Sequence, residues 1–354
     1  MARIAIDAMG GDYAPRKIIE GALWAAQEYG VGLELVGRKE DIEAELNHIR
    51  TVGYILSDCG TKGHKRRISI DVDKIDYTIT HCTEVIGMGE AVGQSIRRKK
   101  DSSIVCSVQA VADGRCEAVV SAGSTGAAMA ASLFGLGRIH GITRPAIAVT
   151  IPTMKKPVVL IDGGANSDCT PEMLCQFAEM GVEYAKLSIG TENPKVGILS
   201  IGEEEGKGNE LIKETYPLLK AKNESGRFSF VGNVEGKEVF TNKADVIVAD
   251  GFAGNIVLKV TEGTASLLLK MIGSEFKSDI IGCVIGLLAK PFLRRILKRI
   301  NWEVFGGMLL LGVNGISVIA HGRSSAYAMK NAVGAAVKVL NKDINSKIAE
   351  HINN

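Results

Sequence analysis

Short runs of β-branched and aliphatic residues alternate with longer segments of helical periodicity along almost the whole chain. Such alternation is typical of a sheet covered by helices on both faces. We therefore predict an α/β fold with three α/β/α layers around a doubly wound, mostly parallel sheet. The expected strands span residues 3–7, 33–36, 118–121, 146–151, 158–162, 196–201, 246–250 and 316–321.

Proline and glycine mark the expected helix ends. Pro15 suits the first turn of a helix, and Gly30 suits its end. Thr170 and Pro171 open another helix, which we expect to end near Gly181. Because no repeat, low-complexity stretch or linker interrupts the pattern, we predict one catalytic unit over residues 1–354.

Residues 264–303 break the alternation, because they are apolar and helical in period without a strand signal. After Pro291, apolar and basic side chains occupy opposite helix faces. The apolar positions are Phe292, Leu293, Ile296 and Leu297, and the basic ones are Arg294, Arg295, Lys298 and Arg299. A basic amphipathic helix can lie on anionic lipid or pack within a dimer or core. We expect residues 264–303 to make dimer and membrane contacts.

Composition excludes several classes of protein. Basic and acidic side chains nearly balance at 42 and 40, so the overall charge gives no reason to expect nucleic acid. Seven cysteines without a CxxC pair are typical of reduced thiols in a cytosolic protein. The first residues lack a secretory pattern, and the longest nearly uncharged run, residues 280–289, is half of the ~20 residues that a spanning helix needs. We expect a cytoplasmic protein that does not cross a membrane.

Glycine and polar residues follow most of the predicted strands. In open α/β sheets, ligands bind outside the carboxyl ends of strands, where glycines permit close approach and helix N-termini offer free N–H groups. We therefore expect the strand ends to line a single site. The candidate catalytic residues are Asp7, Gly10, Gly11, Asp12, Asp162, Asn166, Lys207, Asn209, Asn233, Asp250, Asn255 and His321. For each strand-end aspartate, the alternative is that it only fixes its own turn.

The turn from Ser121 to Gly126 is the best candidate for binding phosphate. Its hydroxyls and glycines precede an alanine-rich helix, whose N-terminus attracts anions. The predicted phosphate ligands are Ser121, Gly123, Ser124, Thr125 and Gly126. The alternative is an ordinary turn in which Ser124 or Thr125 caps the helix.

Other ligands have no support in the sequence. Residues 202–208 are one residue short of a P-loop and have no hydroxyl after Lys207, which argues against ATP. Residues 87–93 have the wrong spacing for a dinucleotide fingerprint, which argues against NAD. The histidines lack paired ligand spacing, and no serine or cysteine lies in a nucleophile motif. We predict no cofactor, no metal and no covalent catalysis, and a structural role is the alternative for His321.

Nine segments, taken in chain order, give a more specific signal. They read IAIDAMGGDYAP, RRKKDSS, SAGSTGAAMA, RPAIA, DGGAN, IGEEEGKGNEL, FVGNVEG, DGFAGNIVLK and LLGVNGISVIAHG. Together they resemble the phosphate acyltransferase (PlsX) family of bacterial phospholipid synthesis. The resemblance implies a phosphotransacetylase-like and isocitrate-dehydrogenase-like fold, a homodimer, and transfer of a long-chain fatty acyl group from acyl-carrier protein to inorganic phosphate. It also implies a membrane acyltransferase, which adds acyl groups to glycerol phosphate and uses the acyl phosphate.

Two positions depart from the family pattern. Tyr13 stands where the first motif usually has histidine, and Ser124 stands where the third usually has asparagine. Both side chains can still hydrogen-bond a phosphate, so we expect activity to survive.

The implied reaction sets clear requirements for the site. Phosphate already carries a nucleophilic oxygen, so the site must position it and supply donors for the tetrahedral oxyanion and the departing thiolate. We expect Gly10, Gly11 and Asn166 to be such donors, while the strand-end aspartates orient them. Acyl-carrier protein is acidic, so it is expected to dock on Arg97, Arg98, Lys99 and Lys100, or on residues 62–67.

Three alternatives stay open from the sequence. A short-chain phosphotransacetylase would use coenzyme A and would not need the apolar helices of residues 264–303. A decarboxylating dehydrogenase would need NAD and a divalent metal. A non-catalytic scaffold at the membrane surface would bind vesicles without turnover.

Overall fold

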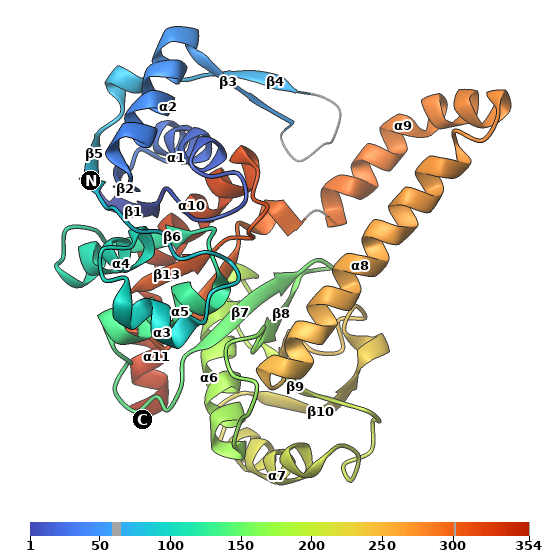
Figure 1. The fold of residues 1–354 in the computed structure, drawn as a ribbon. Coiled ribbons are helices and arrows are strands. Elements are labelled where there is room, and N and C mark those ends of the chain that lie inside the picture. The colour runs from blue at the N-terminus through green and yellow to red at the C-terminus, as the bar shows by residue number, and fades with distance from the viewer. Residues whose placement is uncertain (59–64, 301, 354) are drawn as a thin grey trace.

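The computed structural model describes residues 1–58, 65–300 and 302–353, except for the side chains of residues 298–300 and 302. Helices cover both faces of a long twisted sheet, and a helical hairpin projects from one side (Figure 1). The sheet has the strand order β10-β9-β11-β8-β7-β12-β13-β6-β1-β2-β5. These strands are β1 (Arg3–Asp7), β2 (Gly32–Gly37), β5 (Tyr77–His81), β6 (Ala118–Ser121), β7 (Ala146–Ile151), β8 (Val158–Ile161), β9 (Lys195–Ser200), β10 (Ser229–Glu235), β11 (Val246–Val248), β12 (Met308–Leu311) and β13 (Ile316–Ile319).

Two helical layers bury the faces of this sheet. One layer contains α1 (Arg16–Tyr29), α2 (Lys39–Val52), α6 (Pro171–Ser188), α7 (Glu210–Glu224), α10 (Ala326–Leu340) and α11 (Ile344–Asn353). The other contains α3 (Val92–Arg98), α4 (Ser103–Ala112), α5 (Thr125–Leu136) and the first part of α8 (Gly251–Glu275). Outside these layers are the hairpin β3 (Tyr54–Ser57) with β4 (Arg66–Ser69), the short 3₁₀ helices η1 (Val72–Lys74), η2 (Gly236–Glu238) and η3 (Trp302–Phe305), and α9 (Ile280–Ile300).

The two halves of the sheet run in opposite directions. Strand β7 is antiparallel to β8 and to β12, and β12 is antiparallel to β13. Strands β13, β6, β1, β2 and β5 are parallel to one another, as are β8, β11, β9 and β10. The first group therefore ends on one side of the sheet, here called the Asp7 end, and the second ends on the opposite side, here called the Asp162 end.

The sequence predictions of the main strands are largely confirmed. The structure has β1, β6 and β7 with the predicted bounds, and the other five predicted strands lie within two residues of theirs. It adds β3, β4, β5, β10 and β12, which the sequence analysis did not predict. The predicted end of α1 is correct, since Gly30 is the left-handed C-cap, and Pro15 is the N-cap residue just before the helix.

The predicted end of α6 near Gly181 is wrong, because the helix continues to Ser188. Gly181 is needed for close packing, since a Cβ there would lie 2.6 Å from Val246 Cγ1 of the sheet. The glycine is therefore a contact between helix and strand and not a helix stop.

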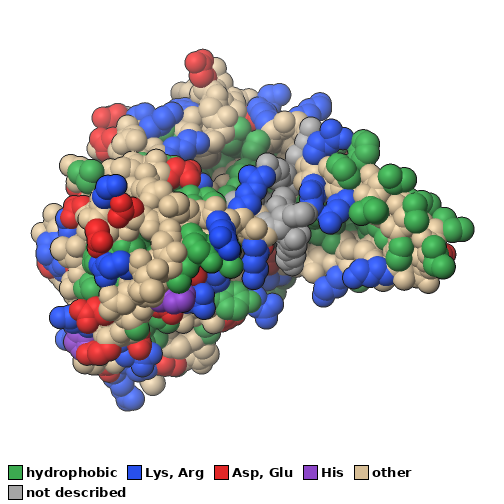
Figure 2. Space-filling model, turned by 90° about the horizontal axis from the view of Figure 1, so that it is seen from above, with side chains coloured by type: hydrophobic (Ala, Val, Ile, Leu, Met, Phe, Trp, Pro, Cys, Tyr) green, Lys and Arg blue, Asp and Glu red, His purple; other side chains and the backbone are tan. Residues whose placement is uncertain are grey.

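The predicted helical segment 264–303 contains the second half of α8 and the whole of α9. Helix α8 ends at Glu275, and α9 runs back from Ile280, so that together they form the projecting hairpin, here called the arm (Figure 1). Hydrophobic side chains gather at its tip, and basic ones lie nearer the body of the molecule (Figure 2). Among the described residues, no helix combines the length and the apolar character needed to cross a membrane.

The predicted faces of α9 are only partly correct. Phe292 and Ile296 are 61% and 54% exposed, whereas Leu293 and Leu297 are half-buried. The Arg295 guanidinium lies 4.8 Å from the centroid of the Phe292 ring, so a basic and an apolar side chain share one face. The side chains of Lys298 and Arg299 lie outside the described part of the chain.

Candidate functional site

Three strand-end loops meet at the Asp7 end of the sheet. A Cβ on Gly10 would lie 2.7 Å from the Gly123 nitrogen, and one on Gly11 would lie 2.9 Å from the Ala122 carbonyl oxygen. The Asp12 N–H donates to the Gly322 carbonyl at 2.7 Å. The loops after β1, β6 and β13 therefore pack closely enough that Gly10 tolerates no side chain.

A buried carboxylate organises the turn after β6. Ser121 Oγ donates to Asp7 Oδ2 at 2.6 Å, and the Gly123 N–H donates to Ser121 Oγ at 3.0 Å. Burial raises the pKa of the Asp7 carboxyl above its ordinary value. Because the Ser121 hydroxyl and the Gly123 amide are already bonded to each other and to Asp7, their predicted role as phosphate ligands is not supported. They hold the turn in place instead.

The N-terminus of α5 follows this turn. Ser124 is its N-cap residue but makes no side-chain capping bond. The first helical bond runs from the Ala128 N–H to the Ser124 carbonyl at 2.9 Å. The N–H groups of Thr125, Gly126 and Ala127 come before this bond and so have no carbonyl partner within the helix. The alternative that Ser124 caps the helix is therefore not supported, and this N-terminus can receive an anion.

His321 faces the same loops from the end of β13. The Arg323 N–H donates to His321 Nδ1 at 3.0 Å, and burial lowers the pKa of the imidazole. A neutral ring that accepts at Nδ1 carries its proton on Nε2. His321 is therefore set up as a hydrogen-bond donor at neutral pH.

Helix α8 brings two charged residues that the sequence analysis missed. Lys259 and Glu262 both act electrostatically on His321, and they pair with each other at 3.1 Å. Both residues lie within α8, just before the predicted apolar segment 264–303 and away from any strand end. The search for polar residues at strand ends therefore did not find them. The DGFAGNIVLK segment, which includes Lys259, was the only signal in the sequence.

Asp12 and Arg323 complete the charged border of this end. The Arg323 Nε lies 3.6 Å from Asp12 Oδ2, and both side chains are exposed. Tyr13, at the position that departs from the family motif, is 52% exposed beside Asp12. The Asp7 end thus holds anion-binding amides, a neutral imidazole and exposed charges of both signs.

The strand directions contradict the prediction of one site lined by all the strand ends. Asp162, Asn166, Asp250 and Asn255 lie at the Asp162 end, across the sheet from Asp7. Asp162 is fully buried and accepts from the N–H groups of Ile147, Gly164, Ala165 and Asn166 at 2.8–3.1 Å.

Asn166 and Asp250 of this cluster also have hydrogen-bond partners. Asn166 Nδ2 donates to Asp162 Oδ2 at 2.9 Å and to the Pro145 carbonyl at 2.8 Å, and Asp250 caps α8 by accepting from Ala253 N–H at 2.7 Å. A Cβ on Gly164 would lie 3.0 Å from Asn255 Nδ2. The predicted role of Asn166 as an oxyanion donor beside Gly10 and Gly11 is therefore wrong.

Three other candidates lie with β9 and β10, also at the Asp162 end. Asn209 caps α7 by accepting from Ile212 N–H at 3.0 Å. Asn233 is buried within β10, not at a strand end, and its Nδ2 donates to the Glu204 carbonyl at 2.7 Å. Lys207 is exposed on the loop between β9 and α7. The structure does not bring these residues to the Asp7 end.

In the predicted docking cluster at residues 97–100, three basic side chains are exposed and the fourth is paired within the chain. Arg97, Arg98 and Lys100 are exposed on and after α3, which packs against α5. Lys99 Nζ instead donates to Glu90 Oε1 at 2.7 Å and to the Val85 carbonyl, and this bond lowers the pKa of Glu90 to about 2. In the second cluster, Arg66 and Arg67 lie exposed on β4, and residues 62–64 lie outside the described part of the chain.

The fold is that of the phosphotransacetylases. A solved phosphotransacetylase from Streptococcus pyogenes matches with a TM-score of 0.59 at 17% identity, covering 100% of this chain and 94% of that one. This likeness confirms the predicted α/β/α fold class.

Sequence relatives define the family. The model of the family described as "Fatty acid synthesis protein" matches residues 2–347. The "Phosphate acyltransferase" of Dictyoglomus turgidum is 44% identical over 352 residues, covering 99% of this chain and 98% of that protein. That of Heliobacterium modesticaldum is 46% identical over 350 residues, covering 99% and 97%. The chain belongs to this family of phosphate acyltransferases and is an acyltransferase, which confirms the resemblance and sets aside the scaffold and dehydrogenase alternatives.

Proposed function

We propose that the protein transfers a long-chain acyl group from acyl-carrier protein to inorganic phosphate at the Asp7 end of the sheet. The observation that carries this proposal is the N-terminus of α5, which has no side-chain cap and lies where the loops after β1, β6 and β13 meet. Such a helix terminus attracts an anion through its amides and its dipole. The relatives are named phosphate acyltransferases, so we take this anion to be phosphate.

The groups around this terminus suit each step of the transfer. The amides of Thr125, Gly126 and Ala127, with the Ser124 and Thr125 hydroxyls, hold phosphate so that one oxygen attacks the thioester carbonyl. The carbonyl becomes a tetrahedral oxyanion, which collapses to an acyl phosphate and releases the carrier thiolate. His321 donates a hydrogen bond from its Nε2–H to the developing negative charge and keeps its proton. Asp7 acts through Ser121 as a positioning residue.

Docking of the carrier is proposed at the exposed basic residues of α3. Arg97 and Arg98 end the helix that packs against α5, and Lys100 follows it, so a carrier bound there has its thioester arm near the phosphate. Carrier proteins are acidic, and complementary charge steers such encounters. The alternative donor is coenzyme A, as in a short-chain phosphotransacetylase, which would not depend on this patch.

The arm supports two further parts of the proposal. Its apolar tip carries Ile280 and Ile281, which are 84% and 71% exposed, and basic side chains lie nearer the body. An apolar tip with a basic border suits both seating on the inner face of the cell membrane and pairing in a homodimer. Peripheral attachment would deliver acyl phosphate to a membrane acyltransferase that acts on glycerol phosphate.

The phosphate site is tested by Ser124→Ala combined with Thr125→Ala. Loss of two hydroxyl donors to an anion should raise the KM for phosphate at least tenfold, which corresponds to about 1.4 kcal/mol, with a smaller change in kcat. Asn209→Ala, at the cap of α7 on the opposite side of the sheet, is the matched control and should leave this KM unchanged. An unaltered KM in the double variant would remove the α5 terminus from the site.

A further inference from the structure

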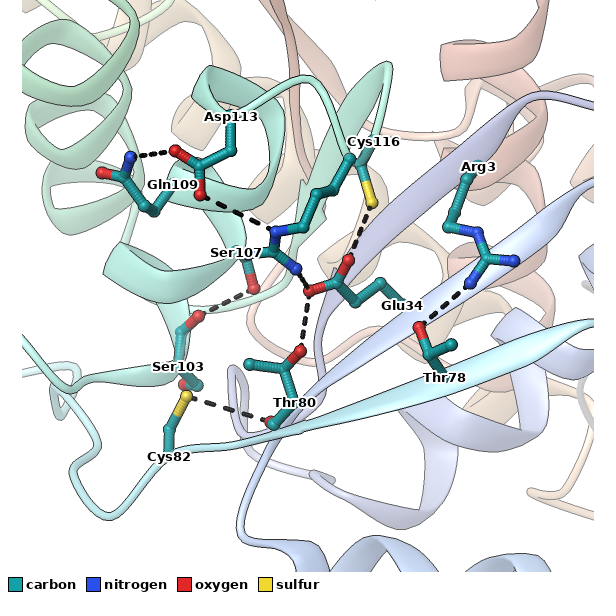
Figure 3. Close-up of polar contacts among 11 residues, drawn as sticks. Arg3, Glu34, Thr78, Thr80, Cys82, Ser103, Ser107, Gln109, Asp113 and Cys116 are labelled. Atoms are coloured by element: carbon teal, nitrogen blue, oxygen red, sulfur yellow. Dashed lines mark hydrogen bonds and ion pairs between the residues drawn. The ribbon is translucent and has the colours of Figure 1, made fainter.

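Two cysteines lie together beside the Asp7 end. Cys82 follows β5 and is fully buried, and Cys106 lies half-buried in the first turn of α4. Their sulfur atoms and an Asp101 carboxylate oxygen all lie within 4.8 Å of one another. The Cys82 thiol points to the Thr80 carbonyl oxygen at 4.0 Å, in the region of Ser103 and Ser107 of α4 (Figure 3). The reaction proposed above uses neither thiol.

The surroundings make the two sulfur atoms unequal. A hydrogen bond from the Cys82 thiol lowers the pKa of Cys106, and the same bond together with burial raises the pKa of Cys82. Asp101 opposes the Cys106 thiolate, and Arg115, which pairs with Glu34 and Asp113, favours it. Because Cys106 is partly exposed whereas Cys82 is buried, a peroxide reaches the Cys106 sulfur first, and Cys106 is the nucleophile of the pair.

Cys169 provides a contrast within the same chain. It has the same intermediate exposure as Cys106, but burial raises its pKa to about 12. A thiol of this kind stays protonated at neutral pH and reacts slowly. Cysteines that sense oxidants are accessible, have a lowered pKa and often lie beside a second cysteine, and Cys106 combines partial exposure, a lowered pKa and the neighbouring Cys82.

We propose that Cys82 and Cys106 form a reversible disulfide when the protein meets a peroxide, and that this disulfide slows acyl transfer. The Cys106 thiolate attacks one peroxide oxygen, which breaks the O–O bond and gives a sulfenic acid and water once the leaving oxygen takes a proton. The Cys82 thiol then attacks the Cys106 sulfur, forming the S–S bond and releasing a second water. The two thiols lose two electrons and two protons, and hydrogen peroxide is reduced to two waters.

The position of the pair connects it to the acyl-transfer site. Ser103 lies three residues before Cys106 on α4 and is among the groups that lower the pKa of the buried Asp7 carboxyl, and the charge of Asp7 also acts on Cys82. In the proposed oxidised form, the sulfur atoms move from within 4.8 Å to the ~2.05 Å of a disulfide, and the start of α4 shifts towards β5. This shift moves Ser103 against Asp7, which positions the phosphate-binding turn through Ser121. The effect on turnover rests on the proposed function, whereas formation of the disulfide does not.

The experiment treats the purified full-length protein with hydrogen peroxide at neutral pH, alkylates the remaining thiols, and maps peptides by mass spectrometry without reduction. We expect a linked Cys82–Cys106 peptide that dithiothreitol removes, and a several-fold fall in phosphate-dependent turnover that dithiothreitol restores. Cys106→Ser should prevent the link, and Cys82→Ser should leave Cys106 trapped as a sulfenic acid. Cys169→Ser is the matched control and should behave like the wild type.

Several results would overturn the proposal. Absence of the linked peptide while Cys106 is oxidised or joined to Cys283 would exclude the disulfide, whatever reaction the enzyme catalyses. Protection of both thiols from alkylation by Zn²⁺ alone, with no link after peroxide, would identify a metal site instead. An oxidised, linked protein with unchanged turnover would exclude the connection to the Asp7 site.

Discussion

Asp7 and Asp162 are both buried carboxylates at strand ends, but their hydrogen bonds assign them to different tasks. Asp7 accepts from Ser121 and so positions the turn before α5, where phosphate is proposed to bind. Asp162 accepts from four backbone N–H groups of its own loop and of β7. The sequence gives both residues the same context, Asp after a buried strand, and only the partners distinguish a positioning residue of the site from a structural one.

Replacing Asp162 tests this assignment. Asp162→Ala leaves several buried N–H donors unpaired, each costing roughly 1–3 kcal/mol, so the free energy of unfolding should fall by about 3 kcal/mol or more. Asp250→Ala removes the acceptor of a single capping bond and should cost only about 1 kcal/mol. Chemical denaturation measures both values.

The enzyme assay supplies the other half of this test. Folded Asp162→Ala protein should keep the wild-type KM for phosphate, because the residue lies across the sheet from α5. A large rise in that KM without loss of stability would contradict the structural role.

At the scale of elements, the hydrophobic pattern predicted most of the buried strands, but it missed the exposed or irregular ones and the short buried strand β12. β6 and β7 are almost entirely buried and have the predicted bounds, because a buried strand reads as a continuous apolar run. β4 is largely exposed, and β10 carries a register shift between Phe230 and Asn233, so neither shows a clean strand pattern. Gly181 was misread as a helix stop because packing, and not capping, requires that glycine.

The candidate site was predictable only in part, because its turn has a local residue pattern but its position relative to other strand ends depends on strand direction. The turn from 121 to 126 could be found from its residues, because hydroxyls and glycines before a helix have a local signature. Which strand ends lie together depends on strand direction, and the antiparallel strands β7 and β12 reverse it. Because β12 was not predicted, the strand pattern did not indicate that Asp162 and Asp7 lie at opposite ends of the sheet.

The arm is the element whose surface predicts a measurable interaction. Ile281 and Leu288 are seven residues apart on one face of α9 and are 71% and 69% exposed. Ile281→Glu with Leu288→Glu should abolish cosedimentation with anionic phospholipid vesicles, because it places charge on the apolar face. These positions are preferable to Leu293 and Leu297, which are half-buried.

The control for the arm is an apolar residue exposed elsewhere on the surface. Leu218→Glu on α7, where the side chain is 39% exposed, should leave vesicle binding intact. Undiminished binding by the arm variant would place the lipid contact on another surface.

At the scale of the whole molecule, the twisted sheet places a basic patch, an anion site and an apolar arm on one protein. The patch on α3 predicts that Arg97→Glu with Arg98→Glu raises the KM for acyl-carrier protein roughly tenfold and weakens its dependence on salt. The KM for phosphate should not change, since the α5 amides stay in place.

A second basic cluster provides the comparison for docking. Arg66→Glu with Arg67→Glu on β4 should leave the KM for the carrier at its wild-type value. If the β4 variant alone is impaired, the carrier docks there, and the proposal for α3 fails.

The most direct test of the whole account mixes the wild-type enzyme with long-chain acyl-carrier protein and radiolabelled phosphate. Thiol release and label in an organic-extractable product are followed together, and acyl-coenzyme A is compared as the donor. The account predicts that both signals appear, depend on phosphate, and are strongest with the carrier-protein donor. Thiol release without labelled product, or a clear preference for short-chain acyl-coenzyme A, would contradict it.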